Sequence, residues 1–124
     1  YIFRPLERVC MTSNGDTAPL HERGRRQLRR ATAILGRKWN PVLIRTLLAD
    51  GPLGFNDIKG RIDGISDKVL SESLEDLQES VLVARDVVED KPVRVHYSLT
   101  PAGRDLEPVI DDLLAWSHEH LGES

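Results

Sequence analysis

Residues 66–101, "SDKVLSESLEDLQESVLVARDVVEDKPVRVHYSLTP", decide the fold of this chain. The leucines of the first half recur at spacings of four and three, which predicts a helix over residues 66–79 with one face in the core. In the second half the apolar spacing changes to two, which predicts strands at 82–88 and 93–99. The four residues "EDKP" between these runs predict a turn, so a helix leads directly into a β-hairpin.

The helix over residues 66–79 has a marked start and two distinct faces. Ser66 is a good N-cap, and Asp67 in the first turn suits the positive end of the helix dipole. The buried face is predicted to consist of Leu70, Leu74 and Leu77. The outward face is predicted to carry Lys68, Ser71, Glu72, Glu75 and Asp76. That outward face is acidic, which is unusual for a helix that would approach DNA.

Three more helices are predicted upstream. The first starts near Glu22 and ends at Gly36. The second has Asn40 as its N-cap, followed by a proline that suits the first helical position. A third, short helix lies within residues 54–62, and Gly64 supplies the turn after it.

A last helix is predicted after the hairpin. Thr100 and Pro101 repeat the cap-plus-proline pattern, and apolar residues then recur towards Leu121. Pro108 lies inside this stretch, where it removes one hydrogen bond and clashes with the carbonyl of Arg104. We therefore expect a kink at Pro108.

The order of elements is helix, helix, helix, helix, hairpin, helix. This order predicts a mainly α fold with a small β-hairpin, the winged helix-turn-helix. In that fold the second helix of the pair enters the major groove of DNA, and the hairpin contacts the backbone or the minor groove beside it. The predicted recognition helix is about 66–79, and the predicted wing is 82–99.

Composition and charge narrow the class of protein. The chain has 124 residues and a net charge of −3. Residues 21–61 hold ten bases against three acids, whereas residues 62–124 hold five bases against fifteen acids. Such asymmetry favours an anionic partner for the first half, or attraction between the two halves. The simpler interpretation of each basic side chain is that it lies on an exposed surface and contacts only water.

The length predicts one domain, residues 21–124, after a disordered N-terminal segment, residues 1–20, that is rich in turn formers. The first methionine is Met11, which is a possible native start. The single cysteine, Cys10, cannot form an internal disulfide, and neither a membrane span nor a signal peptide is evident. These features predict a cytoplasmic protein.

Several short motifs occur in order along the chain and together resemble the HxlR-type winged-helix regulators of bacteria and archaea. They are Gly36-x-Lys38-Trp39, Phe55-Asn56, Gly64-Ile65-Ser66, the Leu70/Leu74/Leu77 helix, Pro92 with Val95-x-Tyr97, and Leu99-Thr100-x-x-Gly103. The resemblance covers roughly Leu28 to Leu121. It implies a homodimeric, cytoplasmic transcription regulator that binds a double-stranded DNA operator. No cofactor and no metal is assigned from the sequence.

The resemblance also implies where the dimer forms. In such proteins the first and last helices make the interface, and here the corresponding apolar residues are Leu28, Ile34, Leu113 and Trp116. Many members carry a cysteine about thirteen residues before the tryptophan, and some use it to sense oxidants. That position is Arg26 here, so sensing by this route is not expected, and the effector stays unassigned.

The predicted DNA contacts come from the recognition helix, the residues before it and the wing. They are Lys38, Lys59, Arg61, Ser66, Lys68, Ser71, Glu72, Ser73, Lys91 and Arg94. Bases supply affinity through phosphates, and Glu72 is placed to accept from a cytosine N4. A high-salt cytoplasm is one account of the acidic helix, because the Debye length falls to roughly 3 Å at 1 M.

Two other classes of function stay open. An adaptor that keeps the winged fold but binds only protein would explain the acidic helix. An enzyme is not expected, because His118 and His120 lie two apart on a helix and point about 160° away from each other. No phosphate loop, metalloprotease motif or nucleophile elbow is evident. Metal sensing through His118 or His120 at the dimer interface is a further alternative.

Overall fold

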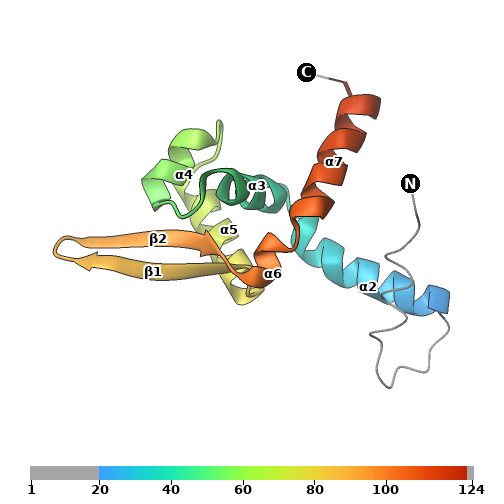
Figure 1. Cartoon of the computed structure of the whole chain (residues 1–124), viewed down its shortest axis with the longest axis horizontal. Helices are drawn as coiled ribbons and strands as arrows, with labels where there is room; N and C mark the ends of the chain where they lie inside the picture. The colour runs from blue at the N-terminus through green and yellow to red at the C-terminus, as the bar shows by residue number, and fades with distance from the viewer. Residues whose placement is uncertain (1–19, 123–124) are drawn as a thin grey trace.

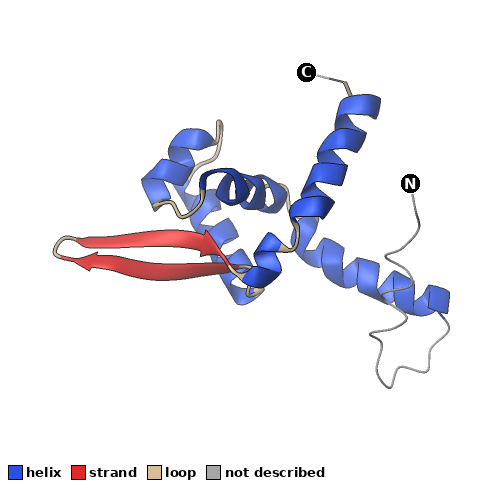
Figure 2. Cartoon of the chain, in the orientation of Figure 1, coloured by secondary structure: helices blue, strands red, loops and turns tan. Residues whose placement is uncertain are grey.

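A computed structural model describes residues 20–122, which form a helical body with a protruding hairpin (Figures 1 and 2). The elements are α2 (Leu20–Leu35), α3 (Asn40–Asp50), α4 (Phe55–Arg61), α5 (Asp67–Glu79), β1 (Val83–Asp90), β2 (Val93–Leu99), α6 (Pro101–Arg104) and α7 (Glu107–His120). The predicted mainly α fold with one β-hairpin is confirmed.

The core lies where α3, α4 and α5 meet the base of the hairpin. Its fully buried side chains are Leu43, Ile44, Ile58, Leu70, Leu74, Leu77 and Asn40. The three leucines of α5 are thus buried as their spacing predicts. Because this face is fixed in the core, the rotation of α5 about its own axis is fixed as well.

The hairpin is longer than predicted. β1 and β2 pair in antiparallel register from Val83 with Leu99 to Asp90 with Val93, so two residues, and not four, form the turn. A bulge interrupts the pairing between Val87 and Glu89. Near the base, Leu53 adds an isolated bridge to Tyr97, which ties the α3–α4 connection to the outer edge of β2. The far half of the hairpin extends beyond the helices (Figure 1), and Val93 is accordingly 68% exposed.

Two N-caps form as predicted. The hydroxyl of Ser66 accepts a hydrogen bond from the Val69 amide at 3.2 Å, and that of Thr100 accepts from the Gly103 amide at 3.1 Å. Thr100 also donates to the Val81 carbonyl at 2.7 Å, so it joins the end of α5 to the start of α6. Gly64, with φ +85°, makes the turn before α5 in a conformation that glycine tolerates.

Two local predictions were wrong. Asn40 is not the cap of α3, because it is the first helical residue, follows Trp39, and turns its side chain into the core. The last helix is not one kinked helix either. α6 ends at Arg104, and α7 begins at Glu107 with Pro108 in its first turn. Proline has no N–H to donate, and the first turn of a helix does not need that donor. The helical structure is therefore interrupted before Pro108, and α7 is not kinked at it.

The helices α2 and α7 extend away from the body on the side opposite the hairpin tip (Figure 1). α2 has no buried residue, and α7 buries only Ile110. Within residues 20–122, none of the helices combines the length and the apolar character that crossing a bilayer requires. The expected disordered segment and possible start at Met11 fall outside the described residues, except for Leu20, which begins α2.

Candidate nucleic-acid interface

The surface of α5 that faces away from the core is available to a partner. Lys68, Ser71, Glu72 and Glu75 are exposed on it, while Ser73 is half-buried. Lys68, Glu72 and Glu75 lie opposite the buried leucines, as the helical spacing predicts, whereas Ser71 and Ser73 lie at the sides of the helix. The first turn therefore presents a base and a hydroxyl, and the later turns present carboxylates.

The start of α5 is held by an ion pair with the preceding helix. The ammonium of Lys59, near the end of α4, contacts the Asp67 carboxylate in the first turn of α5. Both side chains are substantially exposed, so the pair contributes little to stability and exchanges readily with other partners. Asp67 thus offsets Lys59 in the free protein.

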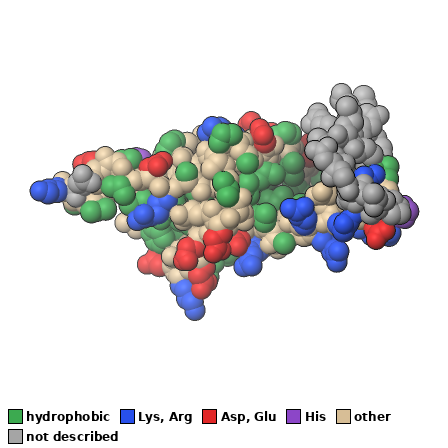
Figure 3. Space-filling view, turned by 90° about the horizontal axis from the view of Figure 1, so that it is seen from below, with side chains coloured by type: hydrophobic (Ala, Val, Ile, Leu, Met, Phe, Trp, Pro, Cys, Tyr) green, Lys and Arg blue, Asp and Glu red, His purple; other side chains and the backbone are tan. Residues whose placement is uncertain are grey.

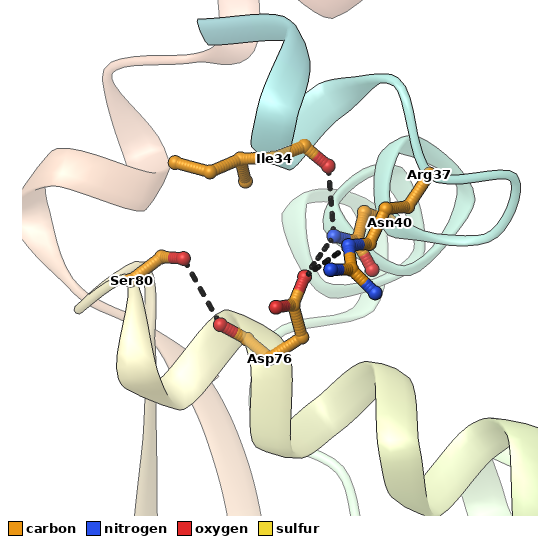
Figure 4. A network of polar contacts seen from close by, with 5 residues as sticks. All are labelled: Ile34, Arg37, Asn40, Asp76 and Ser80. Carbon is orange, nitrogen blue, oxygen red and sulfur yellow. Dashed lines mark hydrogen bonds and ion pairs between the residues drawn. The ribbon is translucent and has the colours of Figure 1, made fainter. Parts of the chain in front are cut away.

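Asp76 does not face outward as predicted. Its carboxylate turns towards the end of α2, where Oδ2 accepts from Asn40 Nδ2 at 2.8 Å and lies 3.4 Å from Arg37 Nε (Figure 4). Asn40 Nδ2 also donates to the Ile34 carbonyl at 2.8 Å. We call Arg37, Asn40 and Asp76 the polar clasp. The buried amide of Asn40, with two acceptors nearby, draws Asp76 inward because an unpaired buried donor is costly.

Lys38 lies beside the outer surface of α5. Its ammonium stands 5.0 Å from the centre of the Trp39 ring. A shallow hollow between this loop and α5 is lined by Arg37, Lys38, Trp39, Val69, Glu72, Ser73 and Asp76. Of the predicted contact residues, Lys38, Glu72 and Ser73 are therefore brought together.

The two predicted basic contacts of the wing lie at different positions along the hairpin. Lys91 is exposed in the turn at the far end of the hairpin, away from the helices (Figure 1). Arg94 lies nearer the body, 3.4 Å from Glu89 on the paired strand. Arg94 also lines a second hollow, between β2 and the start of α4, with Asn56, Asp57 and His96.

Arg61 is engaged elsewhere. Its guanidinium forms an ion pair at 3.0 Å with Asp50 at the end of α3. The structure therefore groups Ser66, Lys68, Ser71 and the Lys59–Asp67 pair at one end of α5, with Lys38 on its flank, whereas Arg61 and Lys91 lie apart. None of these placements by itself establishes contact with DNA, so the contacts stay predictions.

The surface charge is divided between elements. One face has Lys and Arg side chains gathered at its α2 end and acidic side chains in its middle part (Figure 3). Exposed bases of α2 are Arg25, Arg26, Arg29 and Arg30. Three of the five acids of α5 are exposed and form no ion pair with another described residue, namely Glu72, Glu75 and Glu79. Arg85 on β1 is a further exposed base of the hairpin that the sequence did not single out.

The residues predicted for the dimer interface are mostly exposed in the single chain. Leu28 is 65% exposed, Leu113 47% and Trp116 54%, whereas Ile34 is half-buried against its own core. An apolar groove between α3 and α7 is lined by Pro41, Val42, Arg45, Ile110, Leu113, Leu114 and Ser117. These exposed apolar residues form a surface suited to another protein chain.

No group of three or more His, Cys, Asp and Glu side chains in residues 20–122 is placed to hold a metal ion. The ring of His120 instead lies 5.4 Å from that of Trp116, and its Nε2 is 3.8 Å from the Glu119 carboxylate. The two histidines considered for metal sensing thus belong to no cluster of three such ligands in this part of the chain.

Comparison with known proteins places this geometry in context. The family model described as HxlR-like helix-turn-helix matches residues 34–124. The HTH-type transcriptional regulator YodB of Bacillus subtilis is 38% identical over 89 residues, which span 72% of this chain and 79% of YodB. The regulator YvaP of the same organism is 35% identical over 95 residues, 77% of this chain and 87% of YvaP.

Solved structures show the same winged helix-turn-helix architecture. The reduced form of YodB from B. subtilis superposes with a TM-score of 0.67 at 36% identity, over 76% of this chain and 91% of that chain. The redox regulator HypR in its oxidised form superposes with a TM-score of 0.70 at 29% identity, over 76% of this chain and 96% of that chain. The predicted fold is therefore found in relatives of known structure.

Proposed function

The chain belongs to the HxlR-like helix-turn-helix family of transcriptional regulators, and on that premise we propose that it binds a specific double-stranded operator as a homodimer. The suspected resemblance is thereby confirmed. The relatives compared above are transcriptional regulators and not enzymes, which agrees with the expectation that this chain is not an enzyme. In the proposal, α5 enters the major groove and the hairpin contacts the backbone or the minor groove.

The observation that carries the proposal is the fixed orientation of α5. Its buried leucines hold Lys68 and Ser71 outward near the N-terminal end, which is the end that reads bases in helix-turn-helix proteins. Lys38 and Lys59 flank that end, and Lys91 and Arg94 lie on the wing. These bases are the proposed phosphate contacts, and Ser66, Ser71, Glu72 and Ser73 are proposed to make polar contacts with DNA.

In the folded structure the acids of α5 oppose DNA binding less than their number in the sequence suggests. Asp67 and Asp76 have cationic partners from other segments, so their charges are partly offset. Glu72, Glu75 and Glu79 remain and repel phosphates. DNA binding is therefore expected to be weaker than for a basic helix, and to depend more on how far these carboxylates lie from the phosphates.

Dimerisation is proposed to bury the apolar residues of α2 and α7, which include Leu28, Ile34, Leu113 and Trp116. Symmetric homodimers are the commonest soluble oligomers, and a twofold dimer presents two α5 helices to two half-sites. The proposed site of action is the cytoplasm. HypR is described as a redox regulator, but no thiol signal is proposed here because Arg26 occupies the position at which many family members carry a cysteine.

Fluorescence anisotropy tests the proposal. The protein is titrated against a labelled duplex from its own upstream region and against a random duplex, over a series of potassium chloride concentrations. Preference for the upstream duplex, with log affinity falling linearly in log salt, is the expected result. Lys68→Ala should weaken binding, whereas Arg29→Ala on α2 removes another exposed base and serves as control.

The exposed carboxylates Glu72, Glu75 and Glu79 favour one second candidate, a winged-helix adaptor that binds protein and not DNA. The two candidates differ in a simple readout. An adaptor would retain the dimer but select no duplex from a random pool at any salt concentration, and Lys68→Ala would leave its function unchanged.

A further inference from the structure

The polar clasp joins two helices that have different roles in the proposed function. Asn40 is fully buried, and its Nδ2 atom lies 2.8 Å from both the Ile34 carbonyl in the last turn of α2 and the Asp76 carboxylate on α5 (Figure 4). An amide group has two hydrogens, so it can donate to both acceptors at once. Asn40 therefore links α2 directly to α5.

This link affects the orientation of α2, because the described contacts of α2 with the core are mainly at its C-terminal end. The helix has no fully buried residue, and Ile34 and Leu35 in its last turn are the members that pack partly against the core. The clasp acts on this same turn. Arg37, in the connection between α2 and α3, adds a charged contact with the same Asp76 oxygen.

The carboxylate end of the clasp is anchored on a well-fixed part of α5. Asp76 lies between the buried Leu74 and Leu77, and its backbone carbonyl accepts from the Ser80 hydroxyl at 3.0 Å. A shift of α2 relative to α5 would thus break a hydrogen bond to a buried amide, which is disfavoured.

We propose that the polar clasp sets the angle between α2 and α5, and that Asn40 and Asp76 are positioning residues for recognition of paired half-sites. This inference rests on the proposed function, in which α2 contributes to the dimer and α5 reads DNA. A dimer reads two half-sites at one separation only if each α5 is held rigidly relative to the dimer interface. The clasp supplies that rigidity without touching DNA.

Two substitutions on α5 form a matched pair. Asp76→Ala removes the acceptor for Asn40 and the partner of Arg37. Glu75→Ala removes the neighbouring carboxylate, which is exposed and makes no ion pair with another residue of the described chain. Both remove one negative charge from the same turn, so the net charge of the two variants is equal, and the quantities compared are the distance distribution and the half-site spacing rather than the affinity for DNA. Asp76→Asn keeps an oxygen acceptor for Asn40 and should rescue the clasp.

The angle itself is measured by electron–electron distance spectroscopy. Spin labels are attached to Gln27→Cys on α2 and Glu79→Cys on α5, with Cys10→Ser, and labelled chains are diluted into unlabelled protein. We expect a narrow distance distribution in the parent, Glu75→Ala and Asp76→Asn proteins, and a broadened one in Asp76→Ala. An Asp76→Ala distribution as narrow as the parent's would overturn the proposal, provided circular dichroism shows that each variant is folded.

A second arm tests the consequence for recognition. Duplexes selected by the parent protein from a random pool are remade with half-sites moved apart or together by one and two base pairs. The parent and Glu75→Ala should prefer the original spacing, and Asp76→Ala should lose that preference. An unchanged preference in Asp76→Ala contradicts the inference, whereas failure of the parent to select any duplex contradicts the proposed function and leaves the spin-label arm to decide the clasp.

Discussion

Lys59 at the end of α4 and Asp67 in the first turn of α5 form an ion pair across the turn of the helix-turn-helix. The pair places one base and one acid at the end of α5 that is proposed to enter the major groove. In the free protein the acid holds the base, and on DNA a phosphate would compete for it. The electrostatic repulsion between α5 and DNA therefore depends on which acids of α5 are paired with bases, and not only on the number of acids.

Asp67→Asn is expected to strengthen DNA binding. The substitution removes one negative charge and the carboxylate that competes with phosphate for Lys59, so Lys59 neutralises its phosphate more fully and the salt slope steepens by up to about 0.9. The same change removes a carboxylate from the start of a helix, which costs about 0.3–1 kcal/mol of folding stability. Anisotropy titrations in potassium chloride and thermal unfolding measure both effects.

Asp63→Asn is the control for this prediction. Asp63 is an exposed acid in the same turn, and it makes no ion pair with the rest of the described chain. Its substitution should leave the salt slope unchanged. Equal slopes for the two variants would mean that Lys59 is not released towards phosphate.

Val81→Gly is expected to stabilise the protein. Val81 follows α5 with φ +60°, in the left-handed region, where its amide and that of Leu82 donate back to the Gln78 and Leu77 carbonyls. A β-branched residue there costs about 1–2 kcal/mol, part of which the greater freedom of glycine in the unfolded chain offsets. Urea unfolding should show a net gain of about 0.5–1 kcal/mol. Val93→Gly, at an equally exposed valine in a strand, should instead lower stability.

Gly103→Ala is expected to destabilise the junction of the hairpin with α6. A Cβ atom at this position would lie 2.3 Å from the Leu82 carbonyl oxygen and 3.0 Å from Leu99 Cδ2. Forcing backbone and core apart should cost about 1–3 kcal/mol or more in urea unfolding. Gly60→Ala on α4 is the matched control, since nothing lies within 4 Å of its added methyl group. That change should raise stability by about 0.5–1 kcal/mol, and similar losses for both variants would contradict the argument.

The fold was predictable from the sequence because its elements carry local marks. The leucine spacing of α5, the Ser66 cap and the alternation of the strands each act within one element. The kink expected at Pro108 was wrong, because α6 ends at Arg104 and Pro108 lies in the first turn of α7; where a helix ends and the next begins depends on how the segments pack. Its immediate neighbours in sequence do not decide that outcome.

The candidate site was less predictable, because side-chain partners are set by tertiary structure. Asn40 and Asp76 are 36 residues apart, and each has a local pattern that suggests another role, a helix cap for one and an outward acid for the other. The ion pairs of Lys59 and Arg61 likewise depend on how neighbouring elements meet. The residues next to Asn40 carry no local signal that its side chain is buried, so only the tertiary contacts reveal its role.

Trp116→Glu is expected to convert the proposed dimer to a monomer. Trp116 is 54% exposed in the single chain and lies on the apolar surface of α7 with Leu113. Tryptophan is enriched among residues that dominate binding energy, so burying a carboxylate in its place should cost about 2 kcal/mol or more of association free energy. Sedimentation velocity should show the mass falling to that of one 14.0 kDa chain, with loss of preference for a two-half-site duplex.

Val93→Glu introduces the same charge at an exposed valine on the hairpin and should leave the dimer intact. A Trp116→Glu protein that remains dimeric would place the interface away from α7, because a buried, unpaired carboxylate cannot be accommodated at the centre of an apolar contact.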